Sequence, residues 1–212
     1  MGKLNPIFKK NYEDYLLQLK NVDFALCNSN LGINVDEKNL YAKIPFFNTL
    51  YRVSRFGVVD EQGERPKYGI CVILLKYLLM CPQWVPPATD WIPYRDFKDS
   101  GQSQDNGLAD YATMAVTKHY TGKLSRLRAS IAALGGTAPE VEYPYDLSAV
   151  IPALPRIPIL FLFNDADGQF SARTSILYQR RAEHFLDAEC RVMVDGYLLE
   201  HLKKGEHMLT GD

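Results

Sequence analysis

The segment WIPYRDF, residues 91–97, gathers the residue types in this chain that are best able to bind a ligand. Arg95 stands among aromatic residues, with Trp91 and Tyr94 before it. A guanidinium group in such surroundings can stack on a ring or hold an anion through two parallel hydrogen bonds. It can equally form an ion pair that only holds a loop in place. We therefore treat Arg95, Trp91 and Tyr94 as candidate ligand-binding residues, with an intramolecular ion pair as the alternative.

A second candidate is the turn NDADG, residues 164–168, which follows a continuous apolar run. Its carboxylates, Asp165 and Asp167, stand where a buried strand is predicted to end, and binding residues often lie in such loops. An EF-hand is excluded, because placing Gly168 at its sixth position leaves no carboxylate at the first or twelfth. The alternative is a strand-ending turn held by hydrogen bonds from the aspartate side chains to nearby backbone amides.

These two segments together predict where a ligand site would lie. If a ligand site exists, we expect residues 91–97 to meet the turn at Asp165–Asp167. An ion pair between Arg95 and Asp167 would tie the same two loops together without binding anything. The number of residues between the segments does not decide whether they touch.

Other chemistry has little support in the motifs. The four histidines lack H-E-x-x-H spacing, and no two cysteines form a C-x-x-C pair, so we expect no metal site and four reduced, structural cysteines. The chain has no G-x-S-x-G or G-x-G-x-x-G motif, and we expect no cofactor. His201 and His207 stand near the end of the last predicted helix, where the helix dipole favours cations.

Composition narrows the class of protein further. The 212 residues are 47% hydrophobic and 23% charged, with a formal net charge of −1, which predicts one globular domain over residues 1–212. No basic stripe is present, so we expect neither nucleic-acid binding nor a polybasic membrane contact. The polar N-terminus has no signal-peptide pattern, so we expect a cytoplasmic location.

The elements that must position these residues are organised around GICVILLKYLLMC, residues 69–81. Apart from Gly69 and Lys76 the segment is apolar on every side, which predicts a buried helix. It falls short of the about 20 residues that cross a bilayer. Pro66 suits the first turn of this helix, and Pro82 predicts its end.

Local patterns around this helix predict a single α+β domain, in which a largely antiparallel sheet packs with helices around the central helix 69–81. The strands at residues 40–60 should join the apolar strand at 157–163, which has the character of a mid-sheet strand. Asp99–Gly107 is predicted to be a mobile surface loop, and Gly205 to end the last helix. Helices are expected at 5–21, 108–119, 125–134 and 187–204, and strands at 40–46, 50–54, 56–59, 90–97, 145–154, 157–163 and 176–178.

Residues 153–202, from ALPRIP to LLEHL, resemble the C-terminal signature of a prokaryotic family filed as a domain of unknown function. LLKYLL at 74–79 and WIPYRDF at 91–97 are also similar to segments of that family. The resemblance implies a setting mostly in anaerobes, and some relatives are joined to a four-cysteine iron–sulfur domain. That cysteine pattern is not found in this chain.

Three kinds of function remain open. The first, which we expect, is a non-catalytic module that binds a small molecule or a redox partner protein, in anaerobic redox or one-carbon metabolism. The second is an enzyme with an unrecognised acid–base site that uses Asp165, Asp167, His184 or Arg95. The third is a structural protein that assembles with copies of itself, for example as a homodimer.

Overall fold

The apolar segment at the centre of the sequence forms helix α3 (Tyr68–Leu79), which is the buried helix that the sequence predicts. Ile73, Leu74 and Leu78 on this helix have no exposed surface. Its one charged side chain, Lys76, reaches outward, and its Nζ lies 3.1 Å from Oδ2 of Asp187. The helix is therefore apolar where it packs and charged only at its margin.

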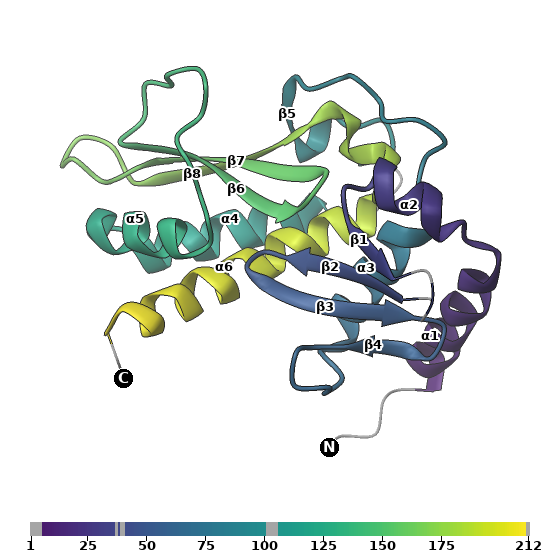
Figure 1. Cartoon of the computed structure of the whole chain (residues 1–212). Helices are drawn as coiled ribbons and strands as arrows, with labels where there is room; N and C mark the ends of the chain where they lie inside the picture. The colour runs from purple at the N-terminus through teal and green to yellow at the C-terminus, as the bar shows by residue number, and fades with distance from the viewer. Residues whose placement is uncertain (1–5, 37, 39–40, 101–105, 211–212) are drawn as a thin grey trace.

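The computed structural model describes residues 6–36, 38, 41–100 and 106–210. Helices pack against two antiparallel sheets, which confirms the predicted α+β class (Figure 1). The other helical segments, with short 3₁₀ helices labelled η, are α1 (Pro6–Gln18), η1 (Leu19–Asn21), α2 (Phe24–Asn30), η2 (Tyr94–Asp96), α4 (Asn106–Tyr120), α5 (Leu124–Ala133), η4 (Arg180–His184) and α6 (Ala188–Thr210). The strands are β1 (Asn34–Asp36), β2 (Tyr41–Phe46), β3 (Thr49–Ser54), β4 (Gly57–Val59), β5 (Trp91–Pro93), β6 (Leu147–Leu154), β7 (Ile157–Asn164) and β8 (Arg173–Gln179).

The first sheet is a meander in which β1, β2, β3 and β4 pair in sequence order. The hairpin between β2 and β3 turns at Phe47 and Asn48. Phe47 adopts a φ of 50°, which is unusual for a bulky residue, and its side chain is buried. Its backbone amide donates to the carbonyl of Ala153 at 2.8 Å, so the turn contacts the end of strand β6.

The second sheet has the order β5-β8-β7-β6, with β7 inside it as predicted. The prediction that the early strands would join this strand in one sheet is wrong. Strand β7 is paired on both sides by its neighbours in the sequence, β6 and β8, so neither of its edges is open to β2. Close partners along the chain form hairpins at lower entropic cost than distant ones.

Helix α6 runs beneath the second sheet and alongside α3, α4 and α5 (Figure 1). Asp187 caps its start, because its Oδ1 accepts a hydrogen bond from the amide of Cys190 at 2.9 Å. The predicted end at Gly205 is wrong, since the helix continues to Thr210. At Gly205 a Cβ would lie 3.1 Å from the carbonyl oxygen of Ser130, so this glycine allows α5 to approach closely.

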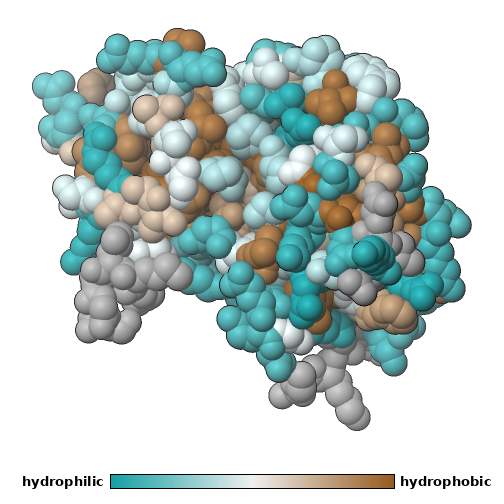
Figure 2. All heavy atoms as spheres, in the orientation of Figure 1, coloured by the Kyte–Doolittle hydropathy of each residue, from teal (hydrophilic) through white to brown (hydrophobic). Residues whose placement is uncertain are grey.

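The loop predicted to be mobile, Asp99–Gly107, falls largely outside the described residues. The surface of the face seen in Figure 1 is mostly hydrophilic, with separate apolar patches (Figure 2). Two of the exposed large apolar side chains lie on helix α4 and the others are spread along the chain, and together they include Leu17, Phe56, Trp84, Tyr111, Met114, Val141 and Phe170. Within the described part of the chain, no helix is both long and apolar enough to cross a membrane.

Candidate functional site

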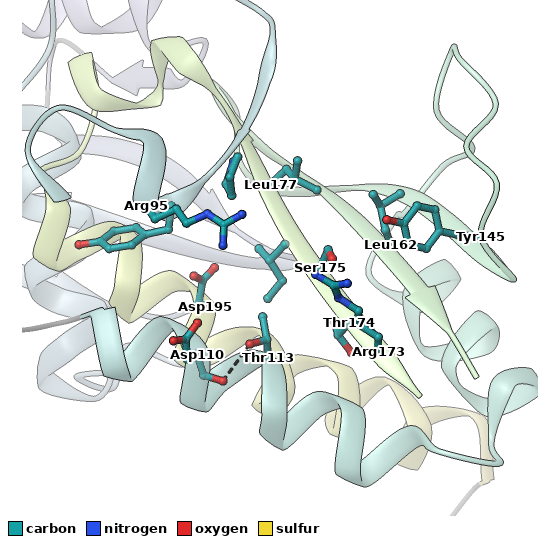
Figure 3. Close-up of a pocket in the computed structure, with 13 residues that line it drawn as sticks. Arg95, Asp110, Thr113, Tyr145, Leu162, Arg173, Thr174, Ser175, Leu177 and Asp195 are labelled. Atoms are coloured by element: carbon teal, nitrogen blue, oxygen red, sulfur yellow. Dashed lines mark hydrogen bonds between the residues drawn. The ribbon is translucent and has the colours of Figure 1, made fainter. Parts of the chain in front are cut away.

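A cavity of about 490 Å³ opens along the edge of β8 at the point where its neighbour β5 ends (Figure 3). It is bounded by the end of β5, by η2, by helix α4 and by a side chain of α6. We call it the β8 groove. The residues that line it include Arg95, Asp110, Leu162, Arg173, Thr174, Ile176, Leu177 and Asp195.

Two arginines lie at the two ends of the β8 groove. Arg95 comes from η2 and Arg173 from the first residue of β8, and both point into the space between them (Figure 3). Arg95 has a loose ion pair with its neighbour Asp96, at 3.8 Å, and both side chains are more than half exposed. Such exposed pairs contribute little to stability. Arg173 has no ion pair within the described residues, so both guanidinium groups are available to a ligand.

Asp195 on α6 lies in the floor of the β8 groove and is only 2% exposed. Burial raises the pKa of its carboxyl group to about 7, although a hydrogen bond from Tyr178 and the positive charge of Arg191 both act to lower it. The hydroxyl oxygen of Tyr178 lies 2.5 Å from Oδ1 of Asp195. Asp195 therefore exists in both protonated and ionised forms near neutral pH.

Arg191 lies one helical turn before Asp195 and has no exposed surface. Its guanidinium group pairs with Asp99, and its Cζ lies 4.2 Å from the centre of the Phe97 ring. Because an unpaired buried charge is costly, this contact fixes the segment that follows η2 against α6. Arg191 thereby holds η2, and with it Arg95, at the mouth of the β8 groove.

Two of the five residues predicted from the sequence, Tyr94 and Arg95, line the β8 groove. Trp91 instead lines a separate cavity of about 420 Å³. Asp165 and Asp167 line a neighbouring cavity of about 450 Å³ beyond the far end of β8.

The two predicted segments do not meet. Pro93 pairs with Leu177, whereas Asn164, just before the aspartate turn, pairs with Arg173. These positions on β8 are four residues apart, which corresponds to about 13 Å. The expected meeting point, and with it the Arg95–Asp167 ion pair, is wrong. The two segments pair with opposite ends of the same strand, and sequence spacing gave no sign of that register.

Both aspartates of the turn accept hydrogen bonds from nearby backbone amides. Oδ1 of Asp165 accepts from Gly122 and Ala166, each at 2.8 Å. Oδ1 of Asp167 accepts from Gln169 and Phe170, and these bonds lower the pKa of its carboxyl group. This geometry matches the strand-ending turn that was the alternative to a binding role.

The histidines and cysteines form no recognisable centre within the described residues. No group of three or more His, Cys, Asp or Glu residues there could hold a metal ion. The four cysteines are all free thiols. His201 is not the cation that its helix position suggested, because burial lowers its pKa to about 4, and the side chain of His207 lies outside the described residues.

Sequence reasoning missed four residues of this region, namely Arg173, Tyr178, Arg191 and Asp195. One signal was available in the run CRVMVDGYLL, where Arg191 and Asp195 stand four apart in an otherwise apolar helical stretch. Charges at that spacing share one face of a helix. Two of them inside an apolar stretch indicate a buried polar cluster.

Fold and site together define an α+β protein with a charged groove at the open edge of an antiparallel sheet. The chain belongs to the family described as Domain of unknown function (DUF3786), whose model matches residues 23–201. This confirms the resemblance noted in the sequence at the level of the family, and the match includes every residue of the β8 groove named above. No curated protein and no solved structure gave a significant match to the chain.

Proposed function

We propose that this protein binds a small organic anion with carboxylate groups in the β8 groove. The observation that carries the proposal is the placement of Arg95 and Arg173 at opposite ends of one cavity. Arginine is well suited to hold a carboxylate, because its planar group donates two parallel hydrogen bonds. The volume of about 490 Å³ lies within the range of ordinary ligand pockets.

The remaining walls suit the other parts of such a ligand. Leu162 and Leu177 provide apolar contact for a carbon skeleton. Asp195 donates a hydrogen bond to the ligand when it is protonated and repels an anion when it is ionised. Since its pKa is about 7, affinity for a carboxylate should fall as the pH rises through neutrality.

Isothermal titration calorimetry with succinate, glutarate and citrate tests the proposal, with 1,4-butanediol as an uncharged control. We expect Arg95→Gln and Arg173→Gln each to weaken binding about tenfold or more, which corresponds to about 1.4 kcal/mol. Arg126→Gln is the matched control, because Arg126 is exposed on α5 and lies outside the β8 groove. The proposal is wrong if no carboxylate binds, or if all three variants bind equally well.

A second function, acid–base catalysis, is favoured by one observation. Asp195 has a pKa of about 7 and lines a ligand-sized cavity, which is what a general acid or base requires. In an enzyme, Asp195→Asn would abolish turnover of the bound molecule and leave its binding largely intact. In a binding protein, nuclear magnetic resonance would show the bound anion unchanged after long incubation with the wild-type protein.

A further inference from the structure

Among the residues that the structure describes, part of one edge of strand β8 has no partner strand, and this edge lies inside the β8 groove. Strand β5 pairs only with Leu177–Gln179, because the chain turns away into η2 at Tyr94. Within the described part of the chain, the first four residues of β8, 173–176, therefore have a neighbouring strand on the β7 side alone. These same residues line the cavity.

The phase of the ladder shows which backbone groups face the cavity. The amide of Arg180 donates to the carbonyl of Asp90 at 2.8 Å, which places the backbone groups of residue 180 on the β5 side. Because these directions alternate along an antiparallel strand, the N–H and C=O groups of Thr174 and Ile176 face the same side. Among the described residues, neither amide donates a backbone hydrogen bond on that side.

A second set of bonds supports the same phase from the opposite edge of the sheet. Val150 of β6 exchanges two backbone hydrogen bonds with Thr137, at 3.0 and 2.8 Å, on the side of β6 that faces away from β7. The hydrogen-bonding direction of the backbone alternates along each strand. Followed from Val150 through β6 and β7, this alternation places the N–H and C=O groups of Ser175 on the side that faces β7. The neighbouring residues on β8 must then face the unpaired edge.

The side chains around this edge differ between the two faces of the sheet. Leu162 and Leu177 line the groove on one face, whereas Asp110 and Asp195 line it beside the helices (Figure 3). An extended peptide presents its side chains alternately to two faces. Such a chain could therefore place apolar groups on the leucines and polar groups near the aspartates.

We propose that the β8 groove binds an extended acidic peptide segment, which adds as a strand to the edge at residues 173–176. Its backbone would pair with Thr174 and Ile176, and acidic residues at its two ends would meet Arg95 and Arg173. Strand addition to an open sheet edge is a common way to recognise peptides. This inference rests on the proposed function and narrows the ligand from a carboxylate-bearing molecule to a peptide.

Two pools of synthetic peptides of about six residues test the inference. Both pools are acetylated, amidated and random at their central positions. One has Asp or Glu at the ends and the other has Lys. We expect the acidic pool to bind about tenfold more tightly or better, and Arg95→Gln and Arg173→Gln to remove this preference. A peptide selected from that pool should lose its binding when the amides that would face β8 are methylated.

Hydrogen exchange followed by nuclear magnetic resonance identifies the binding mode directly. In the free protein the amides of Thr174 and Ile176 should exchange quickly, and that of Ser175 slowly. The selected peptide should slow the first two and leave Ser175 unchanged. The inference is overturned if both pools bind equally, if the methylated peptide binds as well, or if the Thr174 and Ile176 amides remain unprotected.

The carboxylate titrations distinguish a failure of the peptide inference from a failure of the proposed anion binding. If succinate or citrate binds in a manner that depends on the two arginines, but no acidic peptide does, then strand addition is wrong and anion binding stands. If neither class of probe binds, both proposals are wrong.

Discussion

Two buried titratable side chains on helix α6, Asp195 and His201, have pKa values that are shifted toward their neutral forms. Asp195 is 2% exposed and His201 1% exposed, and desolvation is the largest influence on each pKa. Because burial disfavours the charged form, it raises the pKa of the acid and lowers that of the base. The two groups therefore make stability depend on pH in opposite directions, and each can be tested alone.

For Asp195, the pKa rises from its usual 3.8 to about 7 on folding. Between these values the unfolded chain loses the proton and the folded protein keeps it, so wild-type stability falls as the pH rises. Asp195→Asn removes this loss. The free energy of unfolding of Asp195→Asn, relative to that of the wild type, should therefore increase by about 2–3 kcal/mol from pH 5 to pH 8, as measured by urea unfolding. A difference that does not change with pH would contradict this prediction.

For His201, the pKa falls from 6.5 to about 4 on folding, because the ring is buried and packs beside Phe46 and Phe47. As the pH drops below 6.5 the unfolded chain takes up a proton that the folded protein does not, and stability is lost. Relative to His201→Phe, the wild type should lose about 2 kcal/mol between pH 8 and pH 5. Parallel pH profiles of the two proteins in urea would show that the ring titrates normally when folded.

Helix α6 contacts three other helices, α3, α4 and α5, and glycines set how closely two of them approach. At Gly69 on α3 a Cβ would lie 2.6 Å from the hydroxyl of Tyr197 on α6. At Gly205 it would approach Ser130 on α5 to 3.1 Å. Gly196, on the same helix, faces open space. Glycine thus allows close packing at Gly69 and Gly205, whereas Gly196 makes no such packing contact.

Two alanine substitutions on α6 should therefore have opposite effects. Gly196→Ala should stabilise the protein by about 0.5–1 kcal/mol, because alanine is the better helix former and nothing obstructs its methyl group. Gly205→Ala gains the same propensity but must displace α5, so we expect a net loss of about 1–2 kcal/mol. Thermal unfolding of both variants measures the contrast. Equal stabilisation at both positions would show that α5 moves aside without cost.

Across the whole molecule, one continuous cluster of buried residues joins the two sheets. It includes Phe46 of the first sheet, Ile73 of α3 and Phe161 of the second sheet. Strand β2 also contacts β6, where the amide of Phe47 donates to Ala153. If the chain is the single domain that the sequence predicts, a shared core of this kind should couple the two sheets energetically.

The two sheets should consequently unfold together. Phe46→Ala and Phe161→Ala should each cost about 3–5 kcal/mol and lower the midpoint of one common transition. Hydrogen exchange read by mass spectrometry follows strands β3 and β7 separately, while circular dichroism follows the whole chain. Coincident transitions from these probes indicate two-state behaviour. If either variant melts only its own sheet, the chain contains two domains.

The sequence by itself determined the features that depend on short-range chemistry. The burial of α3 followed from an apolar run that has no other place in a folded protein. The hairpins of the first sheet and the central position of β7 followed from residue type and turn spacing. The start of the last helix near residue 187 followed from the helical pattern of the residues after it. The hairpins and the helix start depend on partners close in the sequence. Helix α3 packs against distant segments such as α1 and α6, but its apolar composition alone requires burial.

Only the tertiary structure decided where the candidate site lies. The β8 groove combines η2, the N-terminal part of β8, and helices α4 and α6, and no local pattern fixes the register that joins β5 to β8. The same holds for Asp195 and for Gly205, which was predicted to end a helix and instead packs against α5. Their properties depend on which distant segments surround them, because desolvation and close packing are set by neighbours in space rather than in sequence.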